Sequence, residues 1–268
     1  MIWPRFQRAL VMQEAGDKHD TRRNDSESPG STPLTVLLPV HNEASTIEHV
    51  ISDIYRQVVR PTGAELIVCE DGSTDGTLDV LQRLSTKFPF RLLSDSYRKG
   101  YANAVRDGLS RVRSDFAFFS DSDGQYRSAD FWRLWPYAGE YDMVIGRKVR
   151  REEPFHRTAL SRGFHVLAKS LFDIPHKDID CGFRIINRRV LDEVLPEVGL
   201  LPYSFWAEFT IIAHDSGFKI LEVPISHSSR LQGMTSIYTL DRLPKIVTRQ
   251  LIGLAALRHH RGQRTGKR

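Results

Sequence analysis

Three short apolar runs in the first half of the chain each lead directly into a polar segment with acidic residues. The runs are 34–38, 65–69 and 116–119, and the segments after them are 39–43, 70–77 and 121–125. Runs this short, bounded by polar residues, are typical of buried strands. The stretch 44–55 and the stretch after Gly76 repeat apolar residues at helical spacing. Strands that alternate with such helices predict β–α–β units and a mostly parallel sheet flanked by helices.

The acidic segments are expected to gather at one edge of this sheet, where open α/β sheets bind ligands. Asp121 and Asp123 stand at i and i+2, which project to the same side of an extended chain. With Gln125 they offer oxygen ligands for one hard divalent cation. Mg²⁺ or Mn²⁺ suits this set, and carboxylate-held Mg²⁺ usually completes its coordination with substrate phosphates. The alternative is a solvated turn, but three acidic segments at one edge favour a site.

Four motifs follow one another along the chain. They are PxxNE at 39–43, DGSTDGT at 71–77, KGxxxA at 99–104 and DxDxQ at 121–125. In order and spacing they resemble the family 2 glycosyltransferases, and in particular the dolichol-phosphate mannose synthase-like branch, which glycosylates a polyprenyl phosphate. The resemblance covers about residues 34–236. It implies a GT-A nucleotide-sugar-binding fold, with a catalytic domain at 33–236, and a metal-dependent, inverting hexosyl transfer from a nucleoside-diphosphate sugar.

The resemblance also implies roles on the donor side. Donor-binding roles fall on Pro39, His41, Glu43, Asp71, Lys99, Asp121, Ser122 and Arg230, and metal-binding roles on Asp121, Asp123 and Gln125. The expected cofactor is Mg²⁺ or Mn²⁺, and the expected donor carries UDP or GDP. The chain departs from the usual pattern at Glu70, where Asp is common, and at Ile237, where many relatives have Lys.

On the acceptor side, the branch uses an Arg after a Gly and an Arg-x-x-x-Ser pair to hold the acceptor phosphate. These positions correspond to Arg147, Arg157 and Ser161, and catalytic roles are expected for Asp123, Arg147 and Asp180. Guanidinium groups bind phosphate through charge-assisted hydrogen bonds, although each arginine alone could equally be a solvated surface residue. For Arg184 we expect a structural salt bridge instead of a contact with the acceptor phosphate. His165, in a region where the branch usually has Asn, is expected to be a core histidine.

Two acceptor classes predict different chemistry. A phosphate is already anionic and needs no base, whereas a hydroxyl acceptor needs one, for which Asp180 is the candidate. A third hypothesis is a non-catalytic subunit that binds a nucleotide sugar. The segment 39–43 is not a Gly-rich loop, which argues against a dinucleotide oxidoreductase. A glycosidase would use paired carboxylates without the further acidic segments.

Composition favours a cytoplasmic enzyme. Cys69 and Cys181 have no metal or redox spacing, and we expect both to be reduced. No apolar stretch approaches the ~18 residues of a membrane span, and no secretory signal is recognisable. Residues 1–32 are polar and are predicted to be disordered. The net charge of +5 is concentrated in the C-terminal tail without a nucleic-acid motif, so we expect no nucleic acid partner.

The segment 237–268 is predicted to be a basic amphipathic helix and tail. It has no acidic residue after Asp241, and its apolar residues recur at helical spacing at Leu240, Leu243, Val247, Leu251 and Leu254. Such a helix can bind an anionic membrane surface or a membrane partner subunit. We therefore expect peripheral attachment at the cytoplasmic face of a membrane. The alternative is a helix packed on the catalytic domain.

Overall fold

The computed structural model describes residues 33–149, 155–228 and 243–265, and for 155–162 and 263–265 it describes the backbone alone. The segment 1–32, for which the sequence predicts disorder, lies outside these ranges. All elements described below belong to the unit Thr32–Arg268.

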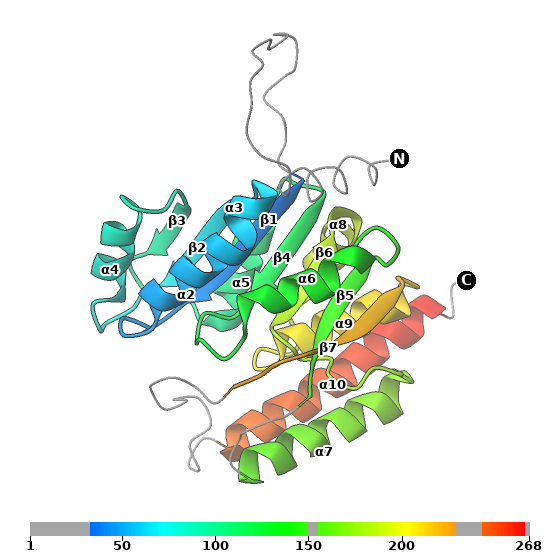
Figure 1. Cartoon of the computed structure of the whole chain (residues 1–268). Helices are drawn as coiled ribbons and strands as arrows, with labels where there is room; N and C mark the ends of the chain where they lie inside the picture. Colours follow the sequence, from blue (N-terminus) through cyan, green and yellow to red (C-terminus); the bar gives the residue numbers. More distant parts are fainter. Residues whose placement is uncertain (1–32, 150–154, 229–242, 266–268) are drawn as a thin grey trace. The chain divides into compact units, whose positions relative to one another are not determined.

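Seven strands form one sheet in the order β3-β2-β1-β4-β6-β5-β7 (Figure 1). The strands are β1 Leu34–Val40, β2 Glu65–Asp71, β3 Arg91–Asp95, β4 Phe116–Ser120, β5 Met143–Lys148, β6 Phe183–Asn187 and β7 Ile220–Ile225. All neighbouring pairs are parallel except β4–β6 and β5–β6, so β6 alone runs against the others. The prediction of a mostly parallel sheet is confirmed. The direction of β6 was not predicted.

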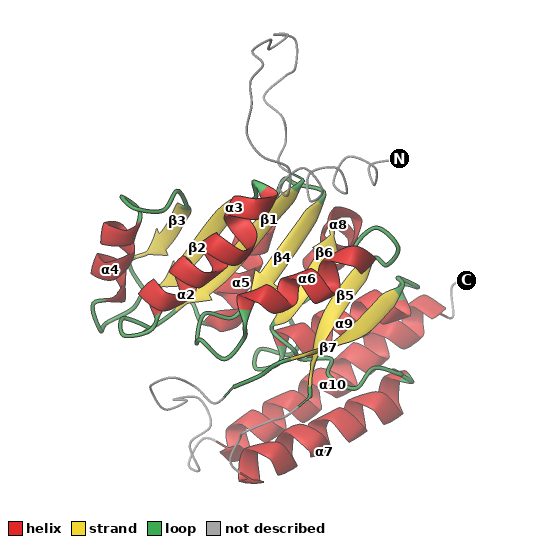
Figure 2. Ribbon diagram, in the orientation of Figure 1, coloured by secondary structure: helices red, strands yellow, loops and turns green. Residues whose placement is uncertain are grey.

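Helices cover both faces of the sheet (Figure 2). They are α2 Ile47–Ile54, α3 Arg60–Thr62, α4 Thr77–Leu84, α5 Tyr101–Ser110, α6 Phe131–Leu134, α7 Phe155–Phe172, α8 Arg188–Val194, α9 Phe205–Asp215 and α10 Leu243–Thr265. A π-helical turn at Tyr55–Val59 joins α2 to α3. In Figure 1, α2 and α6 lie on the near face of the sheet, and α5 and α9 on the far face.

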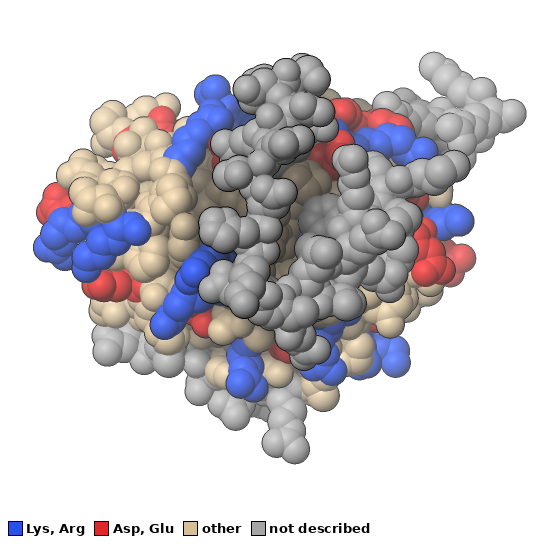
Figure 3. Space-filling model, turned by 45° about the horizontal axis from the view of Figure 1, so that its top comes forward, with Lys and Arg blue, Asp and Glu red and all other residues tan. Residues whose placement is uncertain are grey.

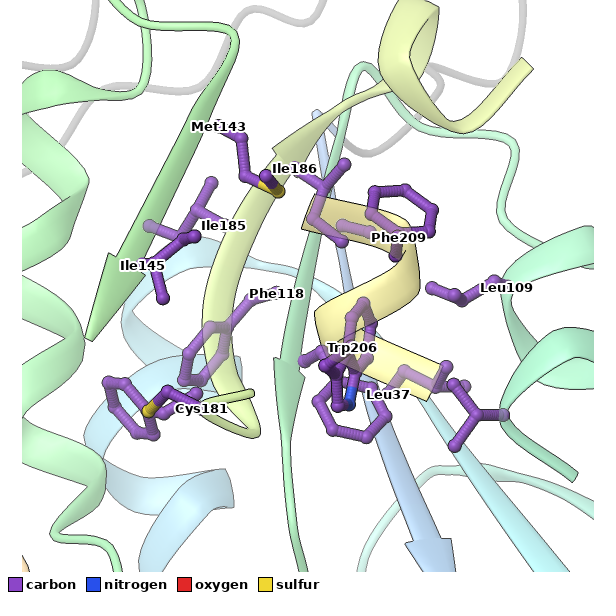
Figure 4. Close-up of a cluster of buried hydrophobic side chains, with 14 of the residues drawn as sticks. Leu37, Leu109, Phe118, Met143, Ile145, Cys181, Ile185, Ile186, Trp206 and Phe209 are labelled. Atoms are coloured by element: carbon purple, nitrogen blue, oxygen red, sulfur yellow. The ribbon is translucent and has the colours of Figure 1, made fainter. Parts of the chain in front are cut away.

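The core is continuous through the middle of the sheet because β4 is buried on both faces. Adjacent side chains of a strand point to opposite faces. Phe118 accordingly packs on Phe131 of α6, with ring centroids 4.9 Å apart, and Phe119 packs on Trp206 of α9 at 4.5 Å. Figure 4 shows Trp206 close to Leu37 of β1. A central strand buried on both sides explains why 116–119 is an unbroken apolar run.

Helices α7 and α10 lie side by side next to the sheet (Figure 1). The described residues that α10 buries include Ile246, Gln250, Leu254, Leu257 and Arg261. Of the apolar residues that define the predicted stripe, Leu254 is buried, Leu243 is half-buried, Val247 and Leu251 are exposed, and Leu240 lies outside the described residues. The helix itself is confirmed. Among the described residues, no helix is long and apolar enough to cross a membrane.

Candidate active site

The carboxyl ends of β1, β2 and β4 lie next to one another at one edge of the sheet. In the pairing register Val40 stands opposite Glu70, so the segments after β1 and β2 leave the sheet at the same level. Strand β4 pairs with the other side of β1 in the same direction. The structure therefore brings the predicted acidic segments 39–43, 70–77 and 121–125 to one edge.

The loops that follow β1 and β2 are tied into one unit. Four hydrogen bonds join them: Asn42 N–H to Ser73 Oγ (3.0 Å), Glu43 N–H to Thr77 Oγ1 (2.9 Å), Ala44 N–H to Asp75 Oδ2 (3.1 Å) and Thr74 N–H to Asn42 Oδ1 (2.8 Å). His41 adds a contact of 2.8 Å from Nδ1 to the carbonyl oxygen of Asp71, which makes Nδ1 the protonated nitrogen. The residues of the PxxNE and DGSTDGT motifs thus hold each other in place.

Glu43 is buried in this unit. Its Oε2 accepts a hydrogen bond of 2.8 Å from the hydroxyl of Thr46, just before α2. Asp75 is exposed by comparison. Its partial burial alone would raise the pKa of Asp75, but hydrogen bonds from the Thr77 hydroxyl and the Ala44 N–H outweigh burial and lower it.

Asp71, the last residue of β2, is hydrogen-bonded to the segment before α5. Its two carboxylate oxygens accept hydrogen bonds from the N–H groups of Lys99 (2.7 Å) and Gly100 (2.9 Å), and the residue is 3% exposed. Gly72 has a φ of 60°, and a Cβ at this position would lie 2.5 Å from the backbone nitrogen of Arg98. Only glycine fits there. Asp71 therefore positions the loop that leads into α5.

The side chain of Lys99 is engaged elsewhere. Its Nζ forms ion pairs with Asp107 and, at 2.5 Å, with Asp95. These two carboxylates hold the pKa of Lys99 above its usual value. Within the described structure, Lys99 thus reaches Asp71 through its backbone N–H, whereas its ammonium group is bound to the carboxylates of β3 and α5.

Asp121 and Asp123 follow β4 as predicted, with Ser122 between them. The hydroxyl of Ser122 donates a hydrogen bond of 2.5 Å to the carbonyl oxygen of Pro39, which ties the end of β4 to β1. Burial and the negative charge of Asp123 raise the pKa of Asp121 to about 7. The two carboxylates repel each other, and a divalent cation relieves that repulsion.

Besides these two carboxylates, the described residues near the end of β4 offer few ligands for a metal ion. Gln125 donates from Nε2 to the carbonyl oxygen of Ser228 (3.1 Å), so its Oε1 is the atom suited to a metal. In the described ranges, no three His, Cys, Asp or Glu side chains gather closely enough to hold a metal ion by themselves. A cation bound to Asp121 and Asp123 would therefore take its remaining ligands from substrate and water, as Mg²⁺ commonly does.

Two aromatic residues without a predicted role are linked to Asp121, one directly and one through the other. The hydroxyl of Tyr101 donates to Asp121 Oδ1 (2.7 Å), and the indole N–H of Trp206 donates to the Tyr101 hydroxyl (2.9 Å). Tyr101 begins α5 and Trp206 lies in α9. No periodicity or motif spacing connects two positions so far apart in the chain, so only the fold reveals the contact.

The predicted acceptor residues are only partly described. Arg147 is half-buried near the carboxyl end of β5, which runs parallel to β4 because both are antiparallel to β6. It therefore lies at the same edge as Asp121. Arg157 and Ser161 fall on α7, as their spacing predicted, but their side chains lie outside the described structure. Arg230 also lies outside the described residues.

Asp180 lies half-buried beside the first turn of α9. Its Oδ1 accepts a hydrogen bond of 3.2 Å from the N–H of Ala207. Burial raises the pKa of Asp180, and the influence of His165 and Lys148 opposes this rise. His165, predicted to be a core histidine, is thus half-buried in the neighbourhood of Asp180.

Arg184 is fully buried and structural, but the predicted salt bridge is wrong for the contacts described. Its guanidinium donates to the carbonyl oxygens of Cys181 (2.9 Å from Nε) and Ile179 (3.2 Å), and to the hydroxyl of Thr210 (3.0 Å). Its Cζ also lies 4.1 Å from the centre of a Trp206 ring. Carbonyl dipoles and an aromatic face therefore compensate this buried charge.

Comparison with known proteins identifies the family. The family described as Glycosyl transferase family 2 matches residues 35–195. The chain belongs to this family. As a family 2 glycosyltransferase it is a sugar-transferring enzyme, and the matched residues contain all four motifs and the whole edge formed by β1, β2 and β4.

Curated relatives of this family 2 glycosyltransferase act on polyprenyl phosphates according to their names. The dolichyl-phosphate beta-glucosyltransferase of Saccharomyces cerevisiae is 24% identical over 84% of this chain and 76% of its own length. The polyprenol monophosphomannose synthase of Mycolicibacterium smegmatis is 25% identical over 84% of this chain and 89% of its own. The expected resemblance to the polyprenyl-phosphate branch is confirmed.

Solved structures confirm the fold of the family 2 glycosyltransferase. The glucosyl-3-phosphoglycerate synthase of Mycobacterium tuberculosis in complex with phosphoglyceric acid superposes with a TM-score of 0.64, at 22% identity, over 84% of this chain and 81% of that protein. The same synthase in complex with Mn²⁺, UDP-glucose and phosphoglyceric acid gives a TM-score of 0.62, at 21% identity, over 86% and 80%. At this identity the likeness shows the GT-A fold alone.

Proposed function

We propose that the enzyme transfers a hexose, with inversion, from a nucleoside-diphosphate sugar to a polyprenyl phosphate. The observation that carries the proposal is the half-buried pair Asp121 and Asp123 at the carboxyl end of β4, beside the loops after β1 and β2 that are hydrogen-bonded to each other. A diphosphate held through a divalent cation is the ligand that such an edge suits. The names of the polyprenyl-phosphate relatives support the acceptor.

On the donor side, Glu43 and Asp71 hold the nucleoside. The rest of this binding site is formed by Pro39, His41, Ser122 and the backbone of Lys99. Asp71 already accepts two backbone N–H groups, and a carboxylate has further lone pairs for a base N–H. Asp121, Asp123 and Gln125 would hold Mg²⁺ or Mn²⁺ on the diphosphate. When bound, the cation neutralises the charge that develops on the leaving group. Arg230 assists with the same charge.

On the acceptor side, Arg147, Arg157 and Ser161 hold the phosphate in line with the anomeric carbon. The phosphate oxygen is anionic near neutral pH, so it attacks without transferring a proton to the protein. The geometry that supports this role is the place of Arg147 at the same sheet edge as Asp121, with the backbone of α7 presenting positions 157 and 161 one turn apart.

The test is release of nucleoside diphosphate from a panel of UDP- and GDP-sugars with Mg²⁺ or Mn²⁺, with and without a polyprenyl phosphate. We expect one donor to be cleaved, lipid to stimulate the release, EDTA to stop it, and the sugar to move into the organic phase. Asp123→Asn should abolish turnover, whereas Asp115→Asn, at an exposed position before β4, should not. Cleavage that lipid does not stimulate would refute the polyprenyl acceptor.

A hydroxyl acceptor is the second candidate, because burial raises the pKa of Asp180 and so makes its carboxylate a better proton acceptor. If a hydroxyl is the acceptor, Asp180→Asn should abolish turnover while donor affinity, measured by calorimetry, is retained. If phosphate is the acceptor, the same substitution should leave lipid-dependent turnover within about tenfold of wild type, since no proton is transferred.

We also propose that the enzyme works at an anionic membrane surface, where a polyprenyl phosphate resides. Helices α7 and α10 leave apolar side chains exposed, including Val166 at 68% and Ile252 at 64%. Lys245, Arg249 and Arg258 add positive charge to α10. On the face drawn in Figure 3, by contrast, basic and acidic side chains are interspersed. Exposed apolar groups together with basic residues are the combination that binds anionic lipid interfaces.

A further inference from the structure

One short segment touches both acidic strand ends. The N–H groups of Lys99 and Gly100 bind the carboxylate of Asp71, and the hydroxyl of the next residue, Tyr101, binds the carboxylate of Asp121. Strands β2 and β4, which carry these carboxylates, are separated in the sheet by β1. The start of α5 therefore joins the two carboxylates that the donor site needs.

The direction of the hydrogen bonds around Tyr101 is fixed by chemistry. An indole N–H can only donate, so Trp206 Nε1 must donate to the Tyr101 oxygen (2.9 Å). The single hydroxyl hydrogen of Tyr101 is then directed to Asp121 Oδ1 (2.7 Å), which can only accept when ionised. Each bond in such a chain polarises the next. The hydroxyl of Tyr101 is thus a committed donor to Asp121.

Trp206, which begins this series of hydrogen bonds, is tightly packed. Trp206 is 2% exposed, and its ring packs on Phe119 and lies under the guanidinium of Arg184. Arg184 is in turn fixed by carbonyl oxygens at the turn before β6. Packing on two sides restricts the orientation of this buried ring, and with it the direction of its N–H.

The other oxygen of Asp121 is confined as well. The backbone N–H of Asp121 donates to the carbonyl oxygen of Gly182 (3.0 Å). A Cβ at Gly182 would lie 1.9 Å from Asp121 Oδ2, so this carboxylate rests directly against the glycine. With Oδ1 bound by Tyr101 and Oδ2 against Gly182, the Asp121 side chain has its orientation set before any ligand arrives.

We propose that Tyr101 and Trp206 are positioning residues for Asp121, and that their hydrogen-bond chain preorganises this carboxylate for the cation that carries the donor diphosphate. The inference rests on the proposed function, because that function supplies the cation. Outer partners that orient metal-binding carboxylates typically change metal affinity by 10–100-fold when removed. Loss of the Tyr101 hydroxyl should therefore weaken cation binding without unfolding the protein.

The experiment measures Mn²⁺ binding directly, by electron paramagnetic resonance of free Mn²⁺ titrated with the full chain, in the absence of any sugar nucleotide. We expect Tyr101→Phe to raise the Mn²⁺ dissociation constant about tenfold. Trp206→Phe, which removes the N–H that orients Tyr101, should raise it by a smaller factor in the same direction. In turnover assays, the Mn²⁺ concentration for half-maximal rate should rise in parallel.

Matched controls separate positioning from general structural damage. Tyr137→Phe removes the hydroxyl of a tyrosine that is 40% exposed, against 38% for Tyr101, and Trp132→Phe removes an indole N–H that donates to Gln57 O (2.9 Å). Both should bind Mn²⁺ like wild type, and thermal melts should show all four variants folded. Wild-type affinity in a folded Tyr101→Phe variant would overturn the positioning role alone. Failure of the wild-type protein to bind Mn²⁺ would refute the metal-dependent function and the inference together.

Discussion

At the scale of single residues, Gly182 illustrates how closely the backbone approaches the carboxylate of Asp121. Gly182→Ala would place a Cβ 1.9 Å from Asp121 Oδ2 and 2.5 Å from its Cγ, so the carboxylate must move. A displacement of about 1 Å at a reacting centre can cost about 100-fold in rate. We expect kcat/KM for nucleoside diphosphate release to fall by about that factor in a folded protein.

Gly163→Ala is the control for this substitution, because a Cβ at Gly163 meets nothing within 4 Å. It should leave kcat/KM unchanged. If Gly182→Ala were as active as Gly163→Ala, the orientation of Asp121 would not matter for turnover.

Residue spacing was sufficient to place Asp121 and Asp123 after a buried strand, because a pair of carboxylates directly after an apolar run is a local pattern. It could not find Tyr101 or Trp206. Their proposed roles depend on contacts between α5, α9 and the end of β4. In the sequence, each of the two residues is an ordinary aromatic residue of a helix. The same limit applies to Arg184, whose partners are backbone carbonyl oxygens that no sequence pattern displays.

At the scale of elements, the two loops after β1 and β2 act as one unit through the carboxylate of Asp75. Its pKa is lowered in the folded protein by hydrogen bonds from Thr77 and Ala44. A lowered folded-state pKa stabilises the fold fully above the unfolded value of about 3.9, and this contribution is lost as pH falls through the folded value. The effect is modest because Asp75 is exposed.

Asp75→Asn should therefore lower the melting temperature at pH 6 more than at pH 3, with the difference from wild type shrinking below about pH 3.9. Thermal melts of both proteins across this range measure it. Asp115→Asn, at an exposed position without these hydrogen bonds, serves as the control and should show a small, constant difference. A difference for Asp75→Asn that does not change with pH would contradict the role of the ionised carboxylate.

Most helices and strands could be predicted from the sequence, and the features that the prediction missed have physical causes. Strands and helices at the acidic edge follow from apolar runs and helical periodicity. The reversed direction of β6 does not follow from these patterns, because the direction of a strand depends on how the chain crosses the sheet rather than on local composition. On α10 the chain offers two apolar stripes, one with Ile246 and Leu257 and one with Val247 and Leu251. Periodicity could not tell which of them packs on the domain.

At the scale of the whole molecule, α10 is fastened to the catalytic domain along one side. Arg261 forms ion pairs with Asp215 (3.0 Å) and Glu197 (3.3 Å), and Gly253 approaches the backbone of Leu200 so closely that a Cβ would lie 2.4 Å from its carbonyl oxygen. The other side of the same helix keeps Leu251 49% and Ile252 64% exposed. Packing of α10 on the catalytic domain is therefore compatible with contact between α10 and a membrane, since each would use a different face of the helix.

If the exposed stripe enters a membrane interface, replacing Leu251 and Ile252 by Asp removes its apolar contact and adds two charges that anionic lipid repels. We expect the double variant to bind vesicles containing phosphatidylglycerol at least about tenfold more weakly than wild type, measured by cosedimentation. Wild-type binding should also weaken with added salt, because the basic residues of α10 contribute. Tyr137→Asp, at an exposed aromatic residue of another element, should bind like wild type. Equal binding by the double variant and wild type would instead place the lipid contact on another surface, and the acceptor would then have to reach Arg147 by a route that does not involve α10.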